Sequence, residues 1–354
     1  MSNWKFYLAN SSDLSYNKDI SGEARGKQLS LSHNRSGNFE FNLPMTAENL
    51  YYTQCVQTCV ICLKNNNIVW SGPIWTRSTD FAAAKINFTA VGWFEILMNR
   101  FLWNNVPTYT SQNEGYIALQ LLNIANTDHP TWITMGTNTA TSTRSKKYEI
   151  WQNIGEEIIS LSDIEDGFDL QVDPETRELN IKEWDDYEDR TEIPFGLNWG
   201  PDNISNLVVD ENGGEMRNRI QVVGANSTVY TYNSNSPLFP DNSQDYNGVF
   251  TEIIQATEES DANVLQAIAN AHGAIKQWPI TNYDIQLKPQ GPNNPYEIFE
   301  DYNIGDKIYA TAQKSIEGEK VSMEIEPRIF GATIAIDDNG TERVSSLQTT
   351  FSGS

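Results

Sequence analysis

Apolar and polar residues alternate along the first 90 positions as they do in β-strands. Leu29 and Leu31 alternate with polar neighbours before a polar turn at 35–37, and Phe39 and Phe41 alternate after it. Because successive side chains of a strand point to opposite faces, this pattern predicts a hairpin. A second hairpin is predicted around the three asparagines at 65–67, which separate two apolar runs.

The second arm of that hairpin, "NNNIVWSGPIWTRST", contains two tryptophans and a break. Trp70 and Trp75 flank Gly72-Pro73. Proline cannot donate to a ladder and glycine allows a sharp bend, so we expect β-pairing to end at this point. Large side chains beside a bent strand are typical of either a catalytic cleft or a curved sheet whose core they fill.

Helices enter between about 93 and 161. Trp93, Leu97 and Phe101 recur every four residues after Gly92, which predicts a short amphipathic helix. Ser111 and Glu114 have the spacing of a capping box and open a second helix. A third helix carries its apolar stripe from Ile150 to Leu161, and the Thr/Ser-rich stretch 136–147 before it is predicted to be an exposed loop.

The remainder of the chain returns to β patterns. A hairpin is predicted at 168–181, two alternating arms flank Asn212-Gly213-Gly214, and a last hairpin turns at 338–340. One more helix starts at Ser260 or Asp261 and stops at Gly273. The fold class is therefore mainly β with an α+β insertion. We expect three domains, at 1–105, 106–195 and 196–354, the last with its helix near 260–273.

Composition and charge exclude several classes of function. The chain has 47 acidic and 24 basic residues, a net charge of -23 that repels phosphate backbones, so sequence-specific DNA binding is not expected. No apolar run reaches the ~20 residues that cross a bilayer, and the N-terminus has no signal-peptide pattern. Three cysteines within eight positions form no disulfide framework, which favours folding in a reducing cytoplasm.

The cysteine spacing, Cys55-x3-Cys59-x2-Cys62, matches the cluster loop of radical S-adenosylmethionine enzymes. Three thiolates on one iron–sulfur cluster need a flexible loop, whereas the spacers here are β-branched and form strands. On a strand, Cys55 and Cys59 share one face and Cys62 points to the other. We therefore interpret all three as small apolar fillers of a strand.

Other candidate sites are equally weak. The histidines His33, His129 and His272 lie far apart, without zinc-ligand spacing or a nucleophile elbow. The acidic run at 183–192 lacks the ordered calcium loop and is interpreted as a solvated loop. Trp70, Trp75 and Trp93 occupy patterned apolar positions, which favours the core over a sugar-binding platform. We expect no catalytic, cofactor-binding or metal-binding residues, no cofactor, and no enzymatic activity.

Three segments in the same order resemble one protein family. Residues 68–102 end a strand in "IVWSGPI", continue through "KINFTAVGW" and lead into a short helix. Residues 203–225 contain Asn218-Arg219 and Gly224, and residues 296–348 carry Gly305-Asp306, Arg328-Ile329 and a "D-x-x-G-x-E" hairpin. Together they resemble the tail-hub family, the baseplate hub or minor tail proteins of siphovirus bacteriophages.

The resemblance implies two tail-tube-like β-barrels with an inserted α+β domain. It implies a homotrimeric ring at the tail tip, where three copies with two barrels each adapt the six-fold tail tube to a three-fold tip. The expected partners are the distal tail protein, the tube, tip or fibre proteins and the tape-measure protein, and DNA passes through the lumen without sequence-specific binding. The expected location is the virion, after assembly in the bacterial cytoplasm.

Two alternatives remain open from the sequence. The distal tail protein of the same tail forms a hexameric ring of single barrels with a peripheral domain, and the number of subunits per ring distinguishes it from a hub. A host-recognition module that binds or cleaves carbohydrate belongs to another class of function. Exposed, coplanar tryptophans would favour that module.

Overall fold

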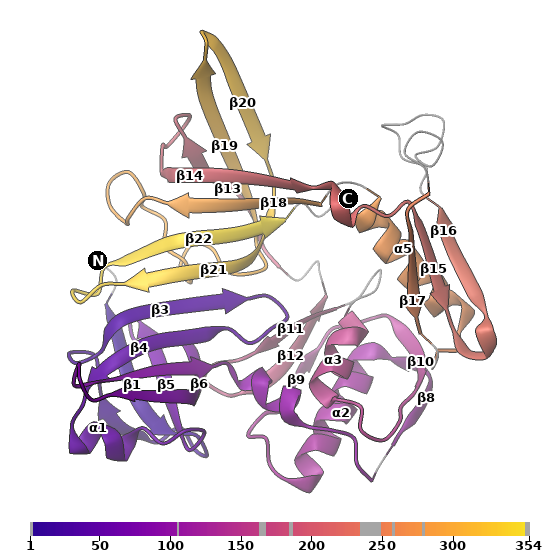
Figure 1. The fold of residues 1–354 in the computed structure, drawn as a ribbon, viewed down its shortest axis with the longest axis horizontal. Helices are drawn as coiled ribbons and strands as arrows, with labels where there is room; N and C mark the ends of the chain where they lie inside the picture. The colour runs from indigo at the N-terminus through magenta and orange to yellow at the C-terminus, as the bar shows by residue number, and fades with distance from the viewer. Residues whose placement is uncertain are drawn as a thin grey trace.

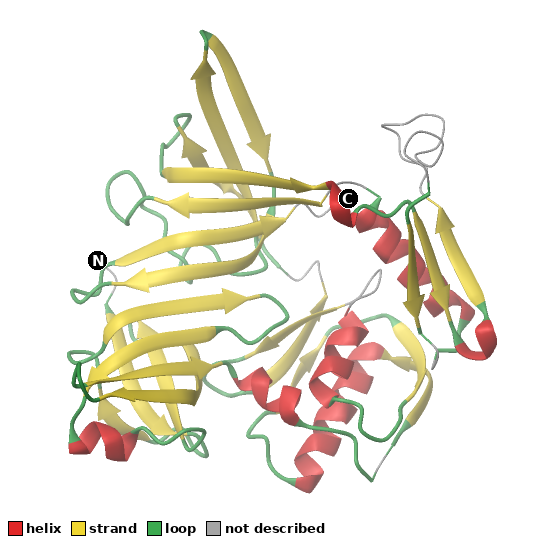
Figure 2. Cartoon of the chain, in the orientation of Figure 1, coloured by secondary structure: helices red, strands yellow, loops and turns green. Residues whose placement is uncertain are grey.

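The computed structural model describes most of the chain, namely residues 3–104, 106–162, 168–183, 187–233, 249–256, 259–277 and 280–350. None of the described helices is long and apolar enough to span a membrane. Strands predominate, and most of the helices lie in the middle of the chain and in one small unit near residue 270, while one short helix lies at the end of the N-terminal strands (Figure 2).

The first part of the chain forms a block of seven strands and one helix. Both hairpins predicted for this part are confirmed, one at 25–44 and one at 58–80. The elements are β1 (Trp4–Asn10), β2 (Tyr16–Asp19), β3 (Arg25–Ser32), β4 (Asn38–Pro44), α1 (Ala47–Tyr52), β5 (Thr58–Lys64), β6 (Asn67–Asp80) and β7 (Lys85–Val91).

The last part of the chain forms a second β block. Its terminal hairpin is confirmed, with β21 and β22 paired antiparallel on either side of the turn at 338–340. The strands are β13 (Asp189–Leu197), β14 (Ile204–Asn212), β18 (Ile280–Leu287), β19 (Lys307–Ile316), β20 (Glu319–Ile325), β21 (Arg328–Ile336) and β22 (Glu342–Thr350). The β19–β20 hairpin projects away from the rest of the molecule (Figure 1).

The two blocks share one sheet of fourteen strands within the described residues. They join where β21 pairs antiparallel with β3, from Gly331 opposite Ser32 to Ile336 opposite Lys27. The main path runs β14-β18-β22-β21-β3-β4-β7-β6-β5-β1-β2, and β13, β19 and β20 branch from it. In Figure 1 the two blocks therefore lie one above the other, with β21 and β3 at their boundary.

The predicted fold class, mainly β with an α+β insertion, is confirmed, but the described strands close no barrel. Closure of the first block would require β3 to pair with β2 at the other end of the path. That edge of β3 is already hydrogen-bonded to β21 of the second block. The pairing that unites the blocks therefore replaces the pairing that would close the first of them.

The first block curls over a core that it shares with the second block. Phe6 of β1 stacks on Phe39 of β4, with ring centroids 5.3 Å apart, although these strands lie at different places along the path. Ile334 and Leu347 of the second block are buried in the same apolar cluster. Burial at about 25 cal/mol per Å² of apolar surface makes this shared core the main force that holds the blocks together.

The middle of the chain packs helices against short sheets around a second core. Ile117, Leu121 and Ile158 are fully buried there. The elements are η1 (Trp93–Asn99), β8 (Thr108–Asn113), α2 (Glu114–Asp128), β9 (Thr134–Asn138), β10 (Thr143–Lys147), α3 (Ile154–Ser162), β11 (Phe168–Val172) and β12 (Glu178–Glu183). The predicted hairpin of β11 and β12 is confirmed.

Several local predictions for this region are wrong. The helix after Gly92 is a 3-10 helix, so the four-residue repeat breaks and Phe101 is exposed. Asn113, not Ser111, caps α2, because its side chain accepts a hydrogen bond from the Tyr116 amide. The predicted loop 136–147 contains the ends of β9 and all of β10, whose polar residues pair with neighbouring strands.

A small third unit consists of β15 (Arg219–Val223), β16 (Val229–Asn233), β17 (Thr251–Gln255) and α5 (Ala262–Lys276), with short 3-10 turns at Gly213–Glu215 and Ala225–Ser227. The two arms around 212–214 are not partners, because β14 pairs with β18 whereas β15 pairs with β16 and β17. Asp261 caps α5 as predicted, but the helix continues past Gly273 to Lys276.

Candidate functional site

The strand β6 turns a corner at Gly72-Pro73. Before this point it pairs with β5, ending with Pro73 opposite Cys59, and after it β6 pairs with β7, starting with Ile74 opposite Ala90. A Cβ added at Gly72 would collide with the backbone carbonyl of Val91, so the close approach requires glycine. Pairing was expected to end at this corner, and only the pairing of β6 with β5 ends there. The strand itself continues to Asp80.

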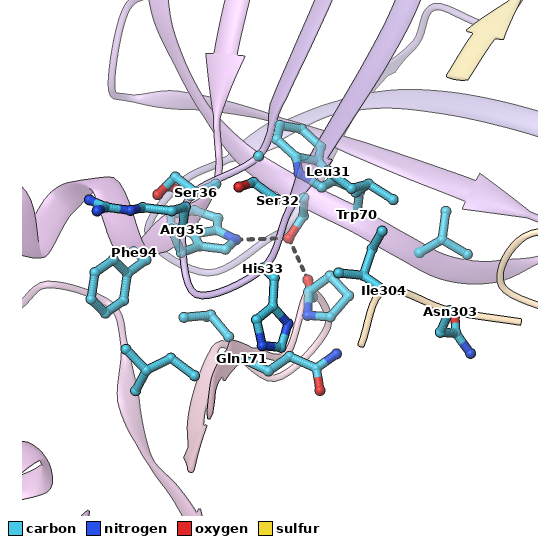
Figure 3. Close-up of a pocket in the computed structure, with 18 of the residues that line it drawn as sticks. Leu31, Ser32, His33, Arg35, Ser36, Trp70, Phe94, Gln171, Asn303 and Ile304 are labelled. Atoms are coloured by element: carbon cyan, nitrogen blue, oxygen red, sulfur yellow. Dashed lines mark hydrogen bonds between the residues drawn. The ribbon is translucent and has the colours of Figure 1, made fainter. Parts of the chain in front are cut away.

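The tryptophans around this corner brace the junction of the first block with the insertion. Trp93 is buried, and its Nε1 donates a hydrogen bond of 2.8 Å to Ser71 Oγ. The Ser71 hydroxyl in turn donates to the backbone carbonyl of Pro174 in the β11–β12 turn, as the dashed lines in Figure 3 show. Trp70 is buried on the other side, in the shared core, and Trp75 is half-buried. Core positions are thus confirmed for Trp70 and Trp93.

A cleft of about 380 Å³ opens beside this corner. Its walls come from the β3–β4 turn, β6, the start of η1, the β11–β12 hairpin and the loop at 299–304. Figure 3 shows His33 and Gln171 at one wall and Asn303 and Ile304 at another, so residues far apart in the sequence face the same space. We call this space the junction cleft.

One wall of the junction cleft is held by a histidine–aspartate pair. His33 Nε2 lies 2.7 Å from Asp169 Oδ1, and both side chains are almost fully buried. Asn34 donates to the same oxygen over 3.0 Å and accepts from the Leu170 amide over 2.6 Å. The His33 amide also donates to the carbonyl of Phe330 in β21. A single turn therefore binds both the insertion and the second block.

The geometry of this pair fits a structural connection. The Ser71 hydroxyl in the cleft is already engaged between Trp93 and Pro174, and no hydrogen bond joins His33 to a serine or cysteine in the described ranges. A nucleophilic triad requires that contact. Asp169 Oδ1 accepts two hydrogen bonds, which matches the rule that buried carboxylates are paired.

A second connection joins the blocks through a buried ammonium group. Lys64, at the end of β5, is fully buried, and its Nζ lies 2.9 Å from Glu342 in β22 and 2.9 Å from Glu297. It also donates to the Ile298 carbonyl over 2.8 Å. The second oxygen of Glu342 accepts from the Trp4 indole over 2.9 Å. We call these residues the Lys64 network.

No protein-family model matches the sequence, and no curated protein is similar to it. Solved structures are similar over the whole chain. A tail protein from Neisseria meningitidis MC58 aligns with a TM-score of 0.65 at 9% identity, covering 99% of this chain and 97% of its own. The chain has the fold of phage tail proteins.

Two further structures agree with this tail-protein fold. The prophage tail protein gp18 from Listeria monocytogenes EGD-e aligns with a TM-score of 0.61 at 12% identity, over 99% of this chain and 95% of its own. The 43 kDa tail protein of prophage MuSo2 from Shewanella oneidensis gives 0.61 at 13% identity, over 97% of both chains. The predicted resemblance to tail-hub proteins is thereby confirmed at the level of the fold.

Within the tail-protein fold the cysteines lie in two environments. Cys59 and Cys62 are buried on opposite faces of β5, in separate apolar clusters, as the strand prediction requires. Burial raises the pKa of the Cys59 thiol to about 12 and raises that of Cys62 well above its ordinary value. Cys55 was predicted on the same strand, but it lies exposed in the turn before β5, because β5 begins only at Thr58.

The remaining candidate residues are spread over the fold. His129 follows the last turn of α2, and His272 lies in α5 with its Nδ1 3.9 Å from Glu252. In the acidic run at 183–192, Arg190 pairs with Glu188 and Glu192, while residues 184–186 lie outside the described ranges. Within those ranges no three His, Cys, Asp or Glu side chains are placed to hold a metal ion.

Neither of the two buried connections is predicted by the local sequence pattern. His33 is separated from Asp169 by 136 positions and Lys64 from Glu342 by 278. Asp169 lies between apolar residues of an alternating strand, where the pattern predicts a solvent-facing side chain. Lys64 ends an apolar strand, where a lysine is ordinarily exposed.

Proposed function

We propose that this protein is a structural component of a phage tail tip, a ring-forming hub around the channel for DNA. The observation that carries the proposal is the likeness to tail proteins over 97–99% of this chain and 95–97% of theirs. The motif order at 68–102, 203–225 and 296–348, which resembles tail-hub proteins, supports the same role.

We prefer a hub to a distal tail protein because each chain contributes two β blocks, whereas a distal tail protein has a single barrel. Three chains would then present six blocks, which matches a six-fold tube on one side and a three-fold tip on the other. For this proposal we retain the division at 1–105, 106–195 and 196–354. The β21–β3 pairing and the Lys64 network would keep the two blocks of one chain in a fixed relation.

The charge of the chain suits a conduit. A net charge of -23 on each copy would repel the phosphates of passing DNA and keep the walls from binding it. The proposed neighbours are the distal tail protein, the tail tube, tip or fibre proteins and the tape-measure protein. The proposed location is the virion, and the proposed role includes no catalysis, because the polar groups of the junction cleft connect segments of the chain.

Mass photometry of the purified chain tests the proposed ring. Each chain has a mass of 40.0 kDa, so a trimer is expected at about 120 kDa and a distal-tail-type hexamer at about 240 kDa. A dominant species of three chains supports the hub. A hexamer would favour the distal tail protein, and a chain that stays monomeric at every concentration would contradict a ring.

A further inference from the structure

A cluster of large apolar side chains lies exposed on the insertion, and we call it the aromatic patch. Its members are Phe101, Trp103, Ile150 and Trp151, each between 52% and 62% exposed. The rings of Trp103 and Trp151 meet edge to face, with centroids 4.3 Å apart and an interplanar angle of 78°. This arrangement is not the coplanar pair that stacks on a sugar.

The exposed position of Trp151 in this patch requires a strained backbone conformation. Trp151 has a φ of +74°, a conformation that is uncommon for a bulky side chain. It is fixed by hydrogen bonds on both sides of the buried Leu102, since the Trp151 amide donates to the Leu102 carbonyl over 2.8 Å and the Leu102 amide donates to Gln152 over 2.9 Å. The fold therefore maintains an exposed indole at a strained position.

The size of the patch matches the centre of a protein interface. With aromatic side chains of 150–250 Å² each about half exposed, the three aromatic residues present roughly 300 Å² of apolar surface, to which Ile150 adds. A standard interface buries about 800 Å² on each partner, with an apolar centre and a polar rim. The aromatic patch would supply that centre.

A second apolar surface lies on the first block, and we call it the α1 patch. It consists of Tyr51 in α1, 70% exposed, and Phe81 in the β6–β7 turn, 79% exposed. The Met45 amide donates to the Ala84 carbonyl over 2.9 Å, which ties the β6–β7 turn to the segment that begins α1. Both side chains thus belong to one end of the block.

The edges of the two patches differ in the sign of their net unpaired charge. Beside the aromatic patch, Glu149, Glu156 and Arg100 form no ion pair within the described part of the chain, which leaves this edge with a net charge of -1. Beside the α1 patch, Arg77, Lys85 and Asp80 form none there either, although Arg77 donates to the Leu50 carbonyl of α1, and this edge has a net charge of +1.

The same asymmetry holds at the scale of the whole chain. Residues 1–105 carry nine basic and seven acidic side chains, whereas residues 106–195 carry six basic and eighteen acidic ones. In an assembly of chains that each carry -23, a contact that sets the insertion against residues 1–105 avoids placing one acidic region on another.

We propose that the aromatic patch of one copy docks on the α1 patch of the next copy in the ring. This inference rests on the proposed ring and names the contact that closes it. The helix α1 and the insertion lie on opposite sides of the first block in Figure 1, as a head-to-tail contact between identical chains requires. The partner is a second copy because this chain itself carries both surfaces, the aromatic patch with its net negative edge and the α1 patch with its net positive edge.

Truncation of either patch tests the contact. Trp103→Ala and Phe81→Ala are each expected to raise the concentration for half-assembly roughly tenfold or more, as aromatic residues central to an interface do. Val321→Ala is the matched control, because Val321 is 56% exposed on the projecting β20 and lies in neither patch. All three changes are at exposed positions, so at concentrations where the chain is monomeric the thermal melt of each variant should match the wild type.

Cross-linking tests the same contact by proximity. The exposed native Cys55 lies in the turn after α1, so a cysteine placed by Glu149→Cys should reach Cys55 of the next copy through a short bismaleimide. Covalent dimers and trimers are expected. Ser322→Cys on β20 is the control and should give only monomer.

The outcomes separate this inference from the proposed function. A wild-type ring that is unaffected by Trp103→Ala and Phe81→Ala, without cross-linking from Glu149→Cys, would overturn the contact and leave the ring standing. A wild-type chain that forms no ring would overturn both. A ring that is unchanged by Trp103→Ala, while that variant loses binding to purified cell-wall glycan, would assign the aromatic patch to sugar binding and overturn the docking proposal.

Discussion

The Lys64 network makes a quantitative prediction about how the two β blocks are held together. Lys64→Met keeps the length of the side chain but removes the ammonium group from a site that is fully buried. The carboxylate of Glu342, only 4% exposed, then loses its cation. Breaking a buried ion pair in this way costs about 3–5 kcal/mol, because the remaining charge is neither solvated nor paired.

That loss translates into a measurable shift in melting temperature. An unfolding entropy of about 2.1 cal/mol/K per residue over 354 residues gives roughly 0.7 kcal/mol per degree, so we expect a decrease of about 4–7 °C. Glu342→Gln in the same chain removes the stranded charge while keeping an acceptor for the Trp4 indole. The double variant should therefore melt higher than Lys64→Met alone.

Calorimetry on the purified proteins provides the assay, with Lys320→Met as the matched control. Lys320 is exposed on β20 and its replacement should change the free energy of unfolding by less than about 0.5 kcal/mol. A Lys64→Met variant that melts like the control would refute the reasoning. So would a double variant that is less stable than the single one.

Two further predictions concern buried side chains of the first block and the insertion. Trp93→Ala should destabilise the protein by about 3–5 kcal/mol, because it empties a core position and removes the hydrogen bond that Ser71 Oγ accepts; a wild-type thermal melt would contradict this. A thiol reagent at pH 8 should modify Cys55 rapidly and Cys59 and Cys62 only after unfolding. The raised pKa of each buried thiol keeps it protonated and unreactive at that pH, and equal rates for all three would contradict the assignment.

Local features of the fold could be predicted because they depend on neighbours in the sequence. The alternation at Leu29–Leu31 and Phe39–Phe41 identified a hairpin, and so did the asparagines between β5 and β6. The capping position of α5 followed from Asp261 for the same reason. Each of these signals operates over a few residues, where side-chain period and turn chemistry decide the structure.

Long-range features could not be predicted. Nothing in the strand Arg25–Ser32 indicates that its free edge pairs with Arg328–Ile336 instead of closing a barrel. The polar composition of Thr143–Lys147 predicts a loop, because composition does not show that Arg144 is buried against Glu114. Strand partners and buried ion pairs are set by the assembled chain, and a single sequence carries no local mark of them.

The exposed side chains of the aromatic patch could not be predicted from the sequence either. Phe101 belongs to an apolar repeat that predicts a buried helix face, yet the helix ends at Asn99 and leaves Phe101 on the surface. A surface of this kind can be recognised only once burial is known. It is also the surface on which assembly with other copies is expected to depend.

The most direct test of the tail-hub account is cryo-electron microscopy of the tail tip of a particle that carries this protein. The account predicts three copies around the central channel, each contributing two β blocks to a six-fold arrangement, with α1 of one copy against the insertion of the next. Density for this chain away from the channel, or a ring of six copies, would contradict it.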